Sequence, residues 1–342
     1  MKNNNRPPSP LKGEFSFPPS GGTKGGLWFL LFSFLLVLLF VLSLKQGYVN
    51  LTLKQFIKVI LGNHPDQLFH DIVFLIRFPR ALTAILIGAL LSVAGCVTQA
   101  TLRNDLAEPY LLGISSGAAF GAAIAIVSGF YAVTGMAFFF AVVALLIVIL
   151  CAAPSRFSIL SIILSGVMVN TFFTTAVMFL MQITTGHEKS MMFWLLGDLA
   201  HLSLNTISQI AMVFGVVILV LMFFAKGLDL FALRDDEIKS LGKNPSLLRF
   251  LFLILSSLLV AYAVSNVGVI GFLGLVVPHL ARSFVGTNHK VLLPFSALLG
   301  AVLLLTADLL AHLTPLVLPV GLITALIGAP LFLRILAQKK YT

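Results

Sequence analysis

The chain has little charge: only 10% of its 342 residues are Asp, Glu, Lys or Arg, against roughly 25% in soluble domains. Hydrophobic residues make up 59% of it, and its mean hydropathy is +1.05. A soluble domain of this length must cover much of its surface with polar groups, and too few are present here. The composition therefore excludes a soluble globular domain and predicts a protein whose main solvent is lipid.

The sequence also lacks the motifs that enzymes and energy-coupling proteins carry. The His-Glu pair at 187–188 has no second histidine at metalloprotease spacing, and the Gly-Lys pair at 242–243 lacks the upstream glycine of a phosphate-binding loop. Cys96 and Cys151 stand apart in apolar runs, which does not indicate a disulfide or a metal site. We expect no catalytic, metal or cofactor site, so a transporter built from this chain takes its energy from a partner or an ion gradient.

Long apolar runs take the place of polar surface. About 20 helical residues cross the hydrocarbon layer of a bilayer, and these runs are apolar on every face, unlike the alternating segments of a membrane barrel. We predict an all-α integral membrane protein. Its ten expected spans are 27–45, 81–101, 111–131, 133–152, 158–182, 203–225, 246–266, 268–284, 292–312 and 319–337. The eighth is short and rich in glycine, so we expect it to be broken or partly re-entrant.

Basic residues predict the side of the membrane that each loop faces. With the N-terminus in the cytoplasm, sixteen of the 22 lysines and arginines lie on the cytoplasmic side, as the positive-inside rule requires. Ten spans return the C-terminus to that side. This rule explains the net charge of +10, so we expect no nucleic-acid partner. The expected location is the inner (cytoplasmic) membrane.

The N-terminal segment differs in composition from the rest. Residues 1–25 are rich in Pro, Gly, Ser and Asn and are predicted to be a disordered cytoplasmic tail, followed by a transmembrane permease domain over 26–342. The apolar run 27–44 is longer than that of a signal peptide, and no cleavage signature follows it. We therefore expect a retained membrane anchor.

Five of the six basic residues predicted outside the cytoplasm lie between Lys45 and Arg80. The positive-inside rule does not account for this cluster. Arg77 and Arg80 either anchor lipid phosphates or form a basic patch for an acidic partner outside the membrane.

Asp308 is the main charged residue within a predicted span, and it lies one helical turn before His312. At this spacing the two side chains face the same way and can pair. The pair fits either a structural contact near the outer surface or a proton relay.

A different pattern marks the predicted cytoplasmic loop 226–246. It carries three adjacent carboxylates, Asp235, Asp236 and Glu237, beside the apolar Ile238. This pattern is typical of a short amphipathic helix. Helices that lie on membranes are usually rich in Lys and Arg, so the carboxylates favour docking to a protein over contact with lipid or a plain connector.

Two blocks of sequence carry a family resemblance. The first begins with RFPR at 77–80 and continues through RNDLAEP at 103–109 to LGISSGA at 112–118. The second is GVIGFLGLVVPHLAR at 268–282, followed by GAPLF at 328–332. On these blocks, the chain resembles the FecCD/BtuC-type ABC-importer permeases, which take up iron siderophores, haem and vitamin B12.

The resemblance, which extends over residues 27–337, implies a type II ABC-importer permease that forms a homodimer around a central pathway. It also implies two cytoplasmic ATPase subunits, which bind ATP and magnesium, and an extracytoplasmic substrate-binding protein. The chain itself would be a transport subunit, not an enzyme, and would bind no cofactor. Ferric siderophore is the expected cargo, with haem and cobalamin as alternatives. The alternative mechanism is a proton-coupled carrier that uses Asp308 and His312.

The resemblance also implies roles for individual residues. Docking of the binding protein is expected at Arg77, Arg80 and His312. The ATPase-coupling element is expected to comprise Leu233, Arg234, Asp235, Asp236, Glu237, Ser240, Leu241 and Gly242. Polar candidates for the pathway are Asn170, Thr171 and Thr174, whose other interpretation is hydrogen bonding to neighbouring helices.

This chain departs from the family pattern at two positions. His312 stands where the family usually has arginine, which would make docking there dependent on pH. Asp105 stands where the family usually has proline, which would relax the start of that loop.

Overall fold

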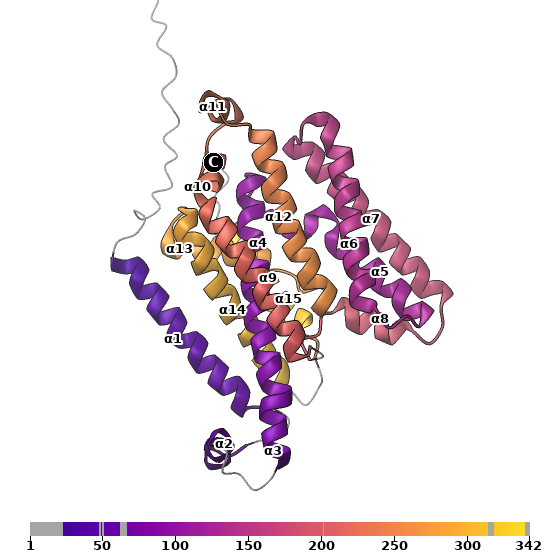
Figure 1. The fold of residues 1–342 in the computed structure, drawn as a ribbon, viewed down its shortest axis with the longest axis vertical. Helices are drawn as coiled ribbons and strands as arrows, with labels where there is room; N and C mark the ends of the chain where they lie inside the picture. Colours follow the sequence, from indigo (N-terminus) through magenta and orange to yellow (C-terminus); the bar gives the residue numbers. More distant parts are fainter. Residues whose placement is uncertain are drawn as a thin grey trace, which may run out of the picture.

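The computed structural model describes residues 23–47, 49, 51–61, 67–200, 202–313 and 318–338. These residues form helices and connecting loops, with no strand among them (Figure 1). The elements are α1 (Thr23–Lys45), α2 (Leu53–Ile60), α3 (Gln67–Asp71), η1 (Ile72–Arg77), α4 (Phe78–Thr101), η2 (Pro109–Leu112), α5 (Ile114–Ser128), α6 (Val133–Ala152), η3 (Ala153–Ser155), α7 (Ile159–Ile183), α8 (Glu188–Leu195), α9 (Leu204–Phe223), α10 (Ala225–Asp229), η4 (Leu230–Ala232), α11 (Asp235–Ser240), α12 (Pro245–Val267), α13 (Leu273–Val285), α14 (His289–Leu313) and α15 (Val320–Gln338). Most of the predicted tail lies outside the described residues, and its last three residues begin α1.

Ten apolar helical segments occupy the regions predicted as spans. Among the described residues, seven are long and apolar enough to cross a membrane: α1, the continuous α3–η1–α4, α6, α7, α9, α12 and α14. Three shorter apolar helices, α5, α13 and α15, complete the set. The all-α membrane fold is therefore confirmed.

The second helical segment begins earlier than expected. It runs without a break over 35 residues, Gln67–Thr101, and includes the π-helical η1. The sequence prediction began at residue 81 because Arg77 and Arg80 interrupt the apolar run. Both arginines instead lie within the helix.

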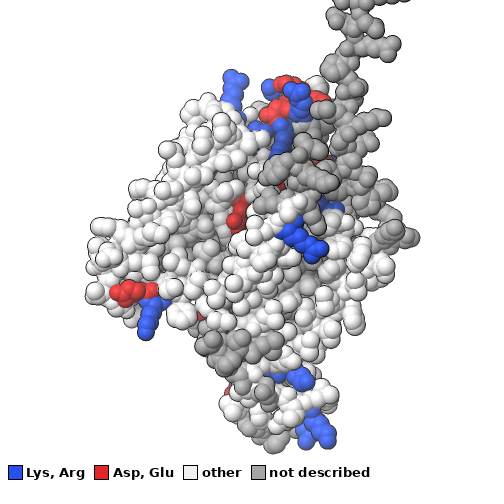
Figure 2. All heavy atoms as spheres, turned by 180° about the vertical axis from the view of Figure 1, so that it is seen from behind, with Lys and Arg blue, Asp and Glu red and all other residues white. Residues whose placement is uncertain are grey.

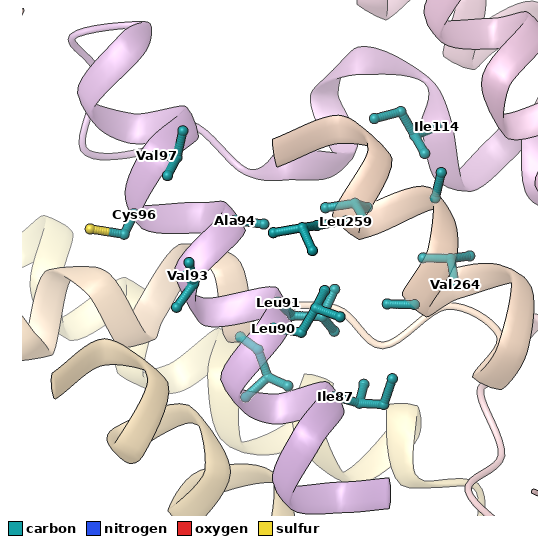
Figure 3. Packing of buried hydrophobic residues seen from close by; sticks show 14 of the residues in the cluster. Ile87, Leu90, Leu91, Val93, Ala94, Cys96, Val97, Ile114, Leu259 and Val264 are labelled. Atoms are coloured by element: carbon teal, nitrogen blue, oxygen red, sulfur yellow. The ribbon is translucent and has the colours of Figure 1, made fainter. Parts of the chain in front are cut away.

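Helix α4 forms the centre of the fold. In the most apolar 18-residue stretch of the segment that contains α4, 83% of the residues are buried, against 6% in the same kind of stretch in α1. Leu90 and Leu91 of α4 lie opposite Leu259 and Val264 of α12 in the buried core (Figure 3). A peripheral α1 and a central α4 are the arrangement expected when lipid surrounds a helical bundle.

Two glycines allow other helices to approach α4 closely. A Cβ atom at Gly95 would lie 2.0 Å from the carbonyl oxygen of Gly274 in α13, and one at Gly88 would lie 2.3 Å from that of Gly300 in α14. Small residues at such crossings let helix backbones touch in membranes. Neither position can accept a side chain without moving a helix.

Charged side chains gather at the two ends of the molecule. Figure 2 shows one group over α11 and another over α2; the surface between them is mostly uncharged, with a small mixed group at one side and a few single charged residues. We call these the α11 end and the α2 end. The surfaces between them include exposed apolar side chains such as Leu30 and Phe34 of α1 and Met168 and Phe172 of α7.

Helix α13 is short because the chain before it is not helical. The helix has 13 residues, a length of about 20 Å at 1.5 Å per residue, which is less than the roughly 30 Å of a bilayer core. The loop 268–272 precedes it and contacts η2: Tyr110 Oη donates to the carbonyl oxygen of Ile270 at 2.8 Å. The predicted eighth span is therefore helical only from Leu273 onward.

Candidate docking and coupling sites

A pocket of about 250 Å³ lies at the α2 end, between the ends of α1, η1, α4 and α14. Its lining includes Arg77, Arg80, Asp308 and His312. The three residues predicted for docking therefore lie around one pocket, although the chain separates Arg80 from Asp308 by 228 positions. The pocket is the candidate docking site.

Within this pocket, Arg77 holds the end of α1. Its Nη1 atom donates to the carbonyl oxygens of Leu44 at 3.0 Å and Lys45 at 2.7 Å, and its Nη2 atom donates to the carbonyl oxygen of Val49. The last carbonyls of a helix have no partner within the helix, and a cation there is favourable. Arg77 thus joins α1 to η1 through its own guanidinium.

Arg80 has a carboxylate partner in its own chain. Its Nε atom lies 2.9 Å from Oδ1 of Asp308, and the two side chains are 16% and 5% exposed. The Nδ1 atom of His312 lies 2.7 Å from the carbonyl oxygen of Asp308 but 3.9 Å from its carboxylate. The expected Asp308–His312 contact is present, and Asp308 is closer to Arg80 than to His312.

At the α11 end, the predicted coupling element is a short helix. Helix α11 has six residues, and the backbone N–H of Arg234 donates to Oε2 of Glu237 at 2.7 Å. Ile238 is fully buried, and Gly242 ends the segment with φ +72°, the left-handed conformation common after helices. The predicted amphipathic helix is confirmed.

The side chains of α11 divide into two groups. Asp236 is 85% exposed and lies 3.5 Å from Lys239, and Leu241 is 57% exposed. Leu233 and Ser240 are also exposed. Asp235 faces the opposite way, 2.7 Å from Arg103 and 3.1 Å from Arg249. Of the eight predicted coupling residues, Asp235 is half-buried and the other seven are exposed.

Two neighbouring arginines set the charge state of Asp235. Partial burial opposes its ionisation, but the charges of Arg249 and Arg103, with their hydrogen bonds, outweigh burial and lower the pKa of the Asp235 carboxyl. Asp235 is thus held as a carboxylate between two guanidinium groups.

Two more ion pairs hold the loops at the α11 end. Oδ1 of Asp105 lies 3.2 Å from Nη1 of Arg282, a residue of α13 that is 9% exposed. Oδ1 of Asp229 lies 2.6 Å from Nδ1 of His289 at the start of α14. The aspartate that replaces the usual proline therefore supplies a contact between its loop and α13.

The predicted pathway residues lie on one helix, α7. Asn170 and Thr171 are exposed and Thr174 is half-buried. The Thr171 hydroxyl donates to the carbonyl oxygen of Val167 in the same helix at 2.9 Å, a bond that threonines in helices commonly make. This face of α7 is on the outside of the subunit.

Sequence reasoning missed the arginines that organise the α11 end. Arg103, Arg249 and Arg282 hold carboxylates from distant segments. A signal was available for Arg249, which stands in the otherwise apolar stretch 247–255. A charge in such a stretch requires a partner, but the sequence does not identify that partner.

Comparison with known proteins identifies relatives along nearly the whole chain. A protein of Helicobacter pylori that is named as an iron chelatin transport system permease is 40% identical over 318 residues. The matched residues cover 89% of this chain and 96% of that protein. The molybdate import system permease of Haemophilus influenzae is 36% identical over 308 residues, which cover 87% and 91%. Both relatives are permease components of import or transport systems.

Solved structures agree with the sequence comparison. A solved structure described as a metal-chelate type ABC transporter in an inward-facing conformation superimposes on this chain with a TM-score of 0.82 at 34% sequence identity. The match covers 92% of this chain and 99% of that one. Residues 35–338 match the model of the FecCD transport family. The chain therefore belongs to the FecCD transport family and is an ABC-importer permease.

Proposed function

We propose that this permease works in the cytoplasmic membrane as a homodimer, in a complex that uses ATP to import a ferric siderophore. The observation that supports this proposal is the division of polar chemistry between two ends joined by one long helix. The segment Gln67–Thr101 begins near the pocket of Arg77 and Arg80. It ends two residues before Arg103, which contacts α11.

In this proposal the α11 ends of the homodimer face the cytoplasm. Together they bind two ATPase subunits, which carry ATP and magnesium. The positive-inside distribution supports this orientation, and it places both chain termini in the cytoplasm. The exposed Asp236, Lys239 and Leu241 offer charged and apolar contacts to a partner. The coupling contact therefore involves this exposed face of α11, and Asp235 lies behind it.

The α2 end receives an extracytoplasmic binding protein. An acidic residue of that protein would approach the pocket lined by Arg77, Arg80 and His312. Because Arg80 is already paired with Asp308 at 2.9 Å, the incoming carboxylate competes with an internal one. Such competition supports a contact that forms and also releases during each transport cycle.

The central pathway lies between two subunits. Asn170 and Thr171 on α7 are exposed on the outside of one subunit, beside large apolar side chains such as Met168 and Phe172. A face with this mixture suits a helix that contacts lipid at one edge and lines a pathway at the other. It lines a pathway only when a second copy faces it.

The cargo proposal rests on the chain's similarity to permeases of metal-chelate systems. Ferric siderophore comes first, with haem and cobalamin as the other cargos that the family resemblance implies. The uncharged α7 face agrees with a bulky chelate that is held loosely, because such a cargo needs shape and weak polar contacts more than an ion pair.

Transport in proteoliposomes tests the proposal. The permease is reconstituted with its cognate ATPase and binding protein, and uptake of a ferric hydroxamate chelate is followed with radioactive iron. ATP-dependent accumulation supports the proposal. Uptake driven by a pH gradient without ATP contradicts it in favour of the proton-coupled carrier. ATP-dependent uptake of haemin or cobalamin alone contradicts only the cargo.

A further inference from the structure

Three charged side chains meet behind the exposed face of α11. Asp235 opens that helix, Arg103 follows α4, and Arg249 lies four residues into α12. Oδ1 of Asp235 lies 2.7 Å from Nη2 of Arg103 and 3.1 Å from Nη2 of Arg249. We call these three residues the Asp235 cluster.

Arg249 is buried within this cluster. The residue is 2% exposed, and its Nη1 atom donates to the carbonyl oxygen of Phe157, in the turn between α6 and α7, at 3.1 Å. Its guanidinium carbon lies 6.0 Å from the centre of the Phe231 ring. A buried cation requires a paired anion, and Asp235 supplies both oxygens to Nη2, at 3.1 and 3.3 Å.

Arg103 ties a third segment to the cluster. Its Nε atom donates to the carbonyl oxygen of Phe231 in η4 at 2.8 Å. Its backbone has φ +48°, a left-handed conformation that costs energy in a residue other than glycine and persists where surrounding contacts hold it. The contacts with Asp235 and Phe231 are of that kind.

The Asp235 cluster therefore joins the C-terminal side of α4, the turn before α7, the segment η4–α11 and the start of α12. Each of these elements leads into a different helix of the bundle. A displacement of α11 either moves these helices or separates Asp235 from Arg103 and from the buried Arg249. By contrast, Asp236, one residue later, is solvated and contacts only Lys239 among the ion pairs of the described chain.

We propose that Asp235 is a positioning residue that transmits the movement of α11 to the membrane helices through Arg103 and Arg249, while the exposed face of α11 binds the ATPase. This inference rests on the proposed coupling of α11 to an ATPase. It separates two functions that lie on adjacent residues: Asp236 contributes to binding the partner, and Asp235 converts that binding into motion of α4, α7 and α12.

The experiment uses the full complex in proteoliposomes and measures co-purification of the ATPase, ATP hydrolysis and uptake per ATP hydrolysed. Asp235→Asn keeps the shape of the side chain and removes its charge. We expect the complex to assemble and hydrolyse ATP, with uptake per ATP reduced about tenfold, because charges in one network couple strongly. Asp236→Asn is expected to weaken ATPase binding instead, with uptake per ATP unchanged in the complexes that form.

Two further variants separate transmission from folding. Arg103→Gln removes the more exposed arginine, whose side chain is 28% exposed, and leaves the Asp235–Arg249 pair in place. Uptake per ATP should fall in this variant too. Glu188→Gln removes a carboxylate from α8, away from α11, and serves as the control for loss of an acidic residue.

Normal uptake per ATP in an assembled Asp235→Asn complex overturns the inference and leaves the proposed function standing. If Asp235→Asn does not assemble, Arg103→Gln decides: normal uptake per ATP overturns the inference, and reduced uptake supports it. Failure of the unaltered permease to bind any ATPase contradicts the proposed function itself.

Discussion

The backbone N–H of Phe272 donates a hydrogen bond to Oε1 of Glu108 at 3.1 Å. Phe272 precedes α13 with φ +68°, and a Cβ atom at Gly328 of α15 would lie 2.4 Å from the Cβ atom of Phe272. Glu108 therefore holds a residue in a left-handed conformation against α15. The contact joins the loop before η2 to the broken part of the eighth span.

Removing this acceptor should destabilise the permease. Glu108→Ala leaves the N–H of Phe272 without its partner, which costs roughly 1–3 kcal/mol. Glu108→Gln keeps an acceptor oxygen and should retain most of the stability. Thermal unfolding of the detergent-solubilised protein measures the difference. Equal melting temperatures for the two variants would show that the hydrogen bond does not stabilise the fold.

Close helix contact should make Gly95 intolerant of substitution. Gly95→Ala places a methyl group against the backbone of Gly274 and forces α4 and α13 apart, at a cost of about 1–3 kcal/mol. Gly215→Ala in α9 is the matched control, because no atom lies within 4 Å of its added Cβ. We expect a lower melting temperature for Gly95→Ala and no decrease for Gly215→Ala.

Competition at Arg80 predicts opposite effects of two substitutions. Arg80→Glu should reduce affinity for the binding protein at least about tenfold, since close charge pairs across interfaces contribute on the order of 1.5 kcal/mol or more. Asp308→Asn removes the internal competitor and should raise that affinity. Binding measured by surface plasmon resonance at low and high salt tests both.

Two results would argue against this competition. Unchanged affinity for Arg80→Glu would exclude Arg80 from the contact, whatever Asp308→Asn does. Weaker binding by Asp308→Asn would mean that Asp308 positions Arg80 for the partner instead of competing with it. Arg77 is a poor choice for this test because its guanidinium holds the end of α1.

Acid should weaken the α11 end. Partial burial opposes ionisation of Asp229, but its hydrogen bonds with His289 outweigh burial and lower the pKa of its carboxyl. The pKa of Asp235 is lowered by its arginines. The contribution of these two carboxylates to the stability of the fold is complete above their unfolded-state pKa of about 3.9. It is lost as pH falls through their lower folded-state pKa values.

Melting temperatures measured from pH 7 down to the lowest pH at which the protein remains folded test this dependence of stability on pH. We expect the wild type to lose stability on acidification by more than Asp229→Asn or Asp235→Asn, which already lack the titrating group. Parallel pH profiles for wild type and variants would show that these carboxylates do not produce the acid sensitivity.

The sequence was sufficient to predict the membrane fold, because the length of apolar runs is set directly by the thickness of the bilayer. It also placed the short eighth span, since Gly268 and Gly271 favour irregular backbone before α13. The start of the second helical segment was misplaced, because the arginines that ended the apolar run belong to the same helix.

The candidate sites were predicted less completely. Arg77, Arg80 and His312 were assigned to one site from family resemblance, and the structure brings them to one pocket. The orientation of Asp235 was not predictable, because three adjacent carboxylates look alike in sequence. Its partners come from α12 and from the loop after α4, and short-range patterns carry no information on such distant pairs.

The long helix Gln67–Thr101 has a mechanical consequence. Its 35 residues make a rod of roughly 50 Å at 1.5 Å per residue, with Arg80 more than a third of the way along it and Arg103 just beyond its C-terminal end. At Gly88 and Gly95 the backbones of α14 and α13 come close to its own backbone. The rod can act as a lever whose fulcrum lies at these close crossings, so that a small tilt moves its two ends in opposite directions.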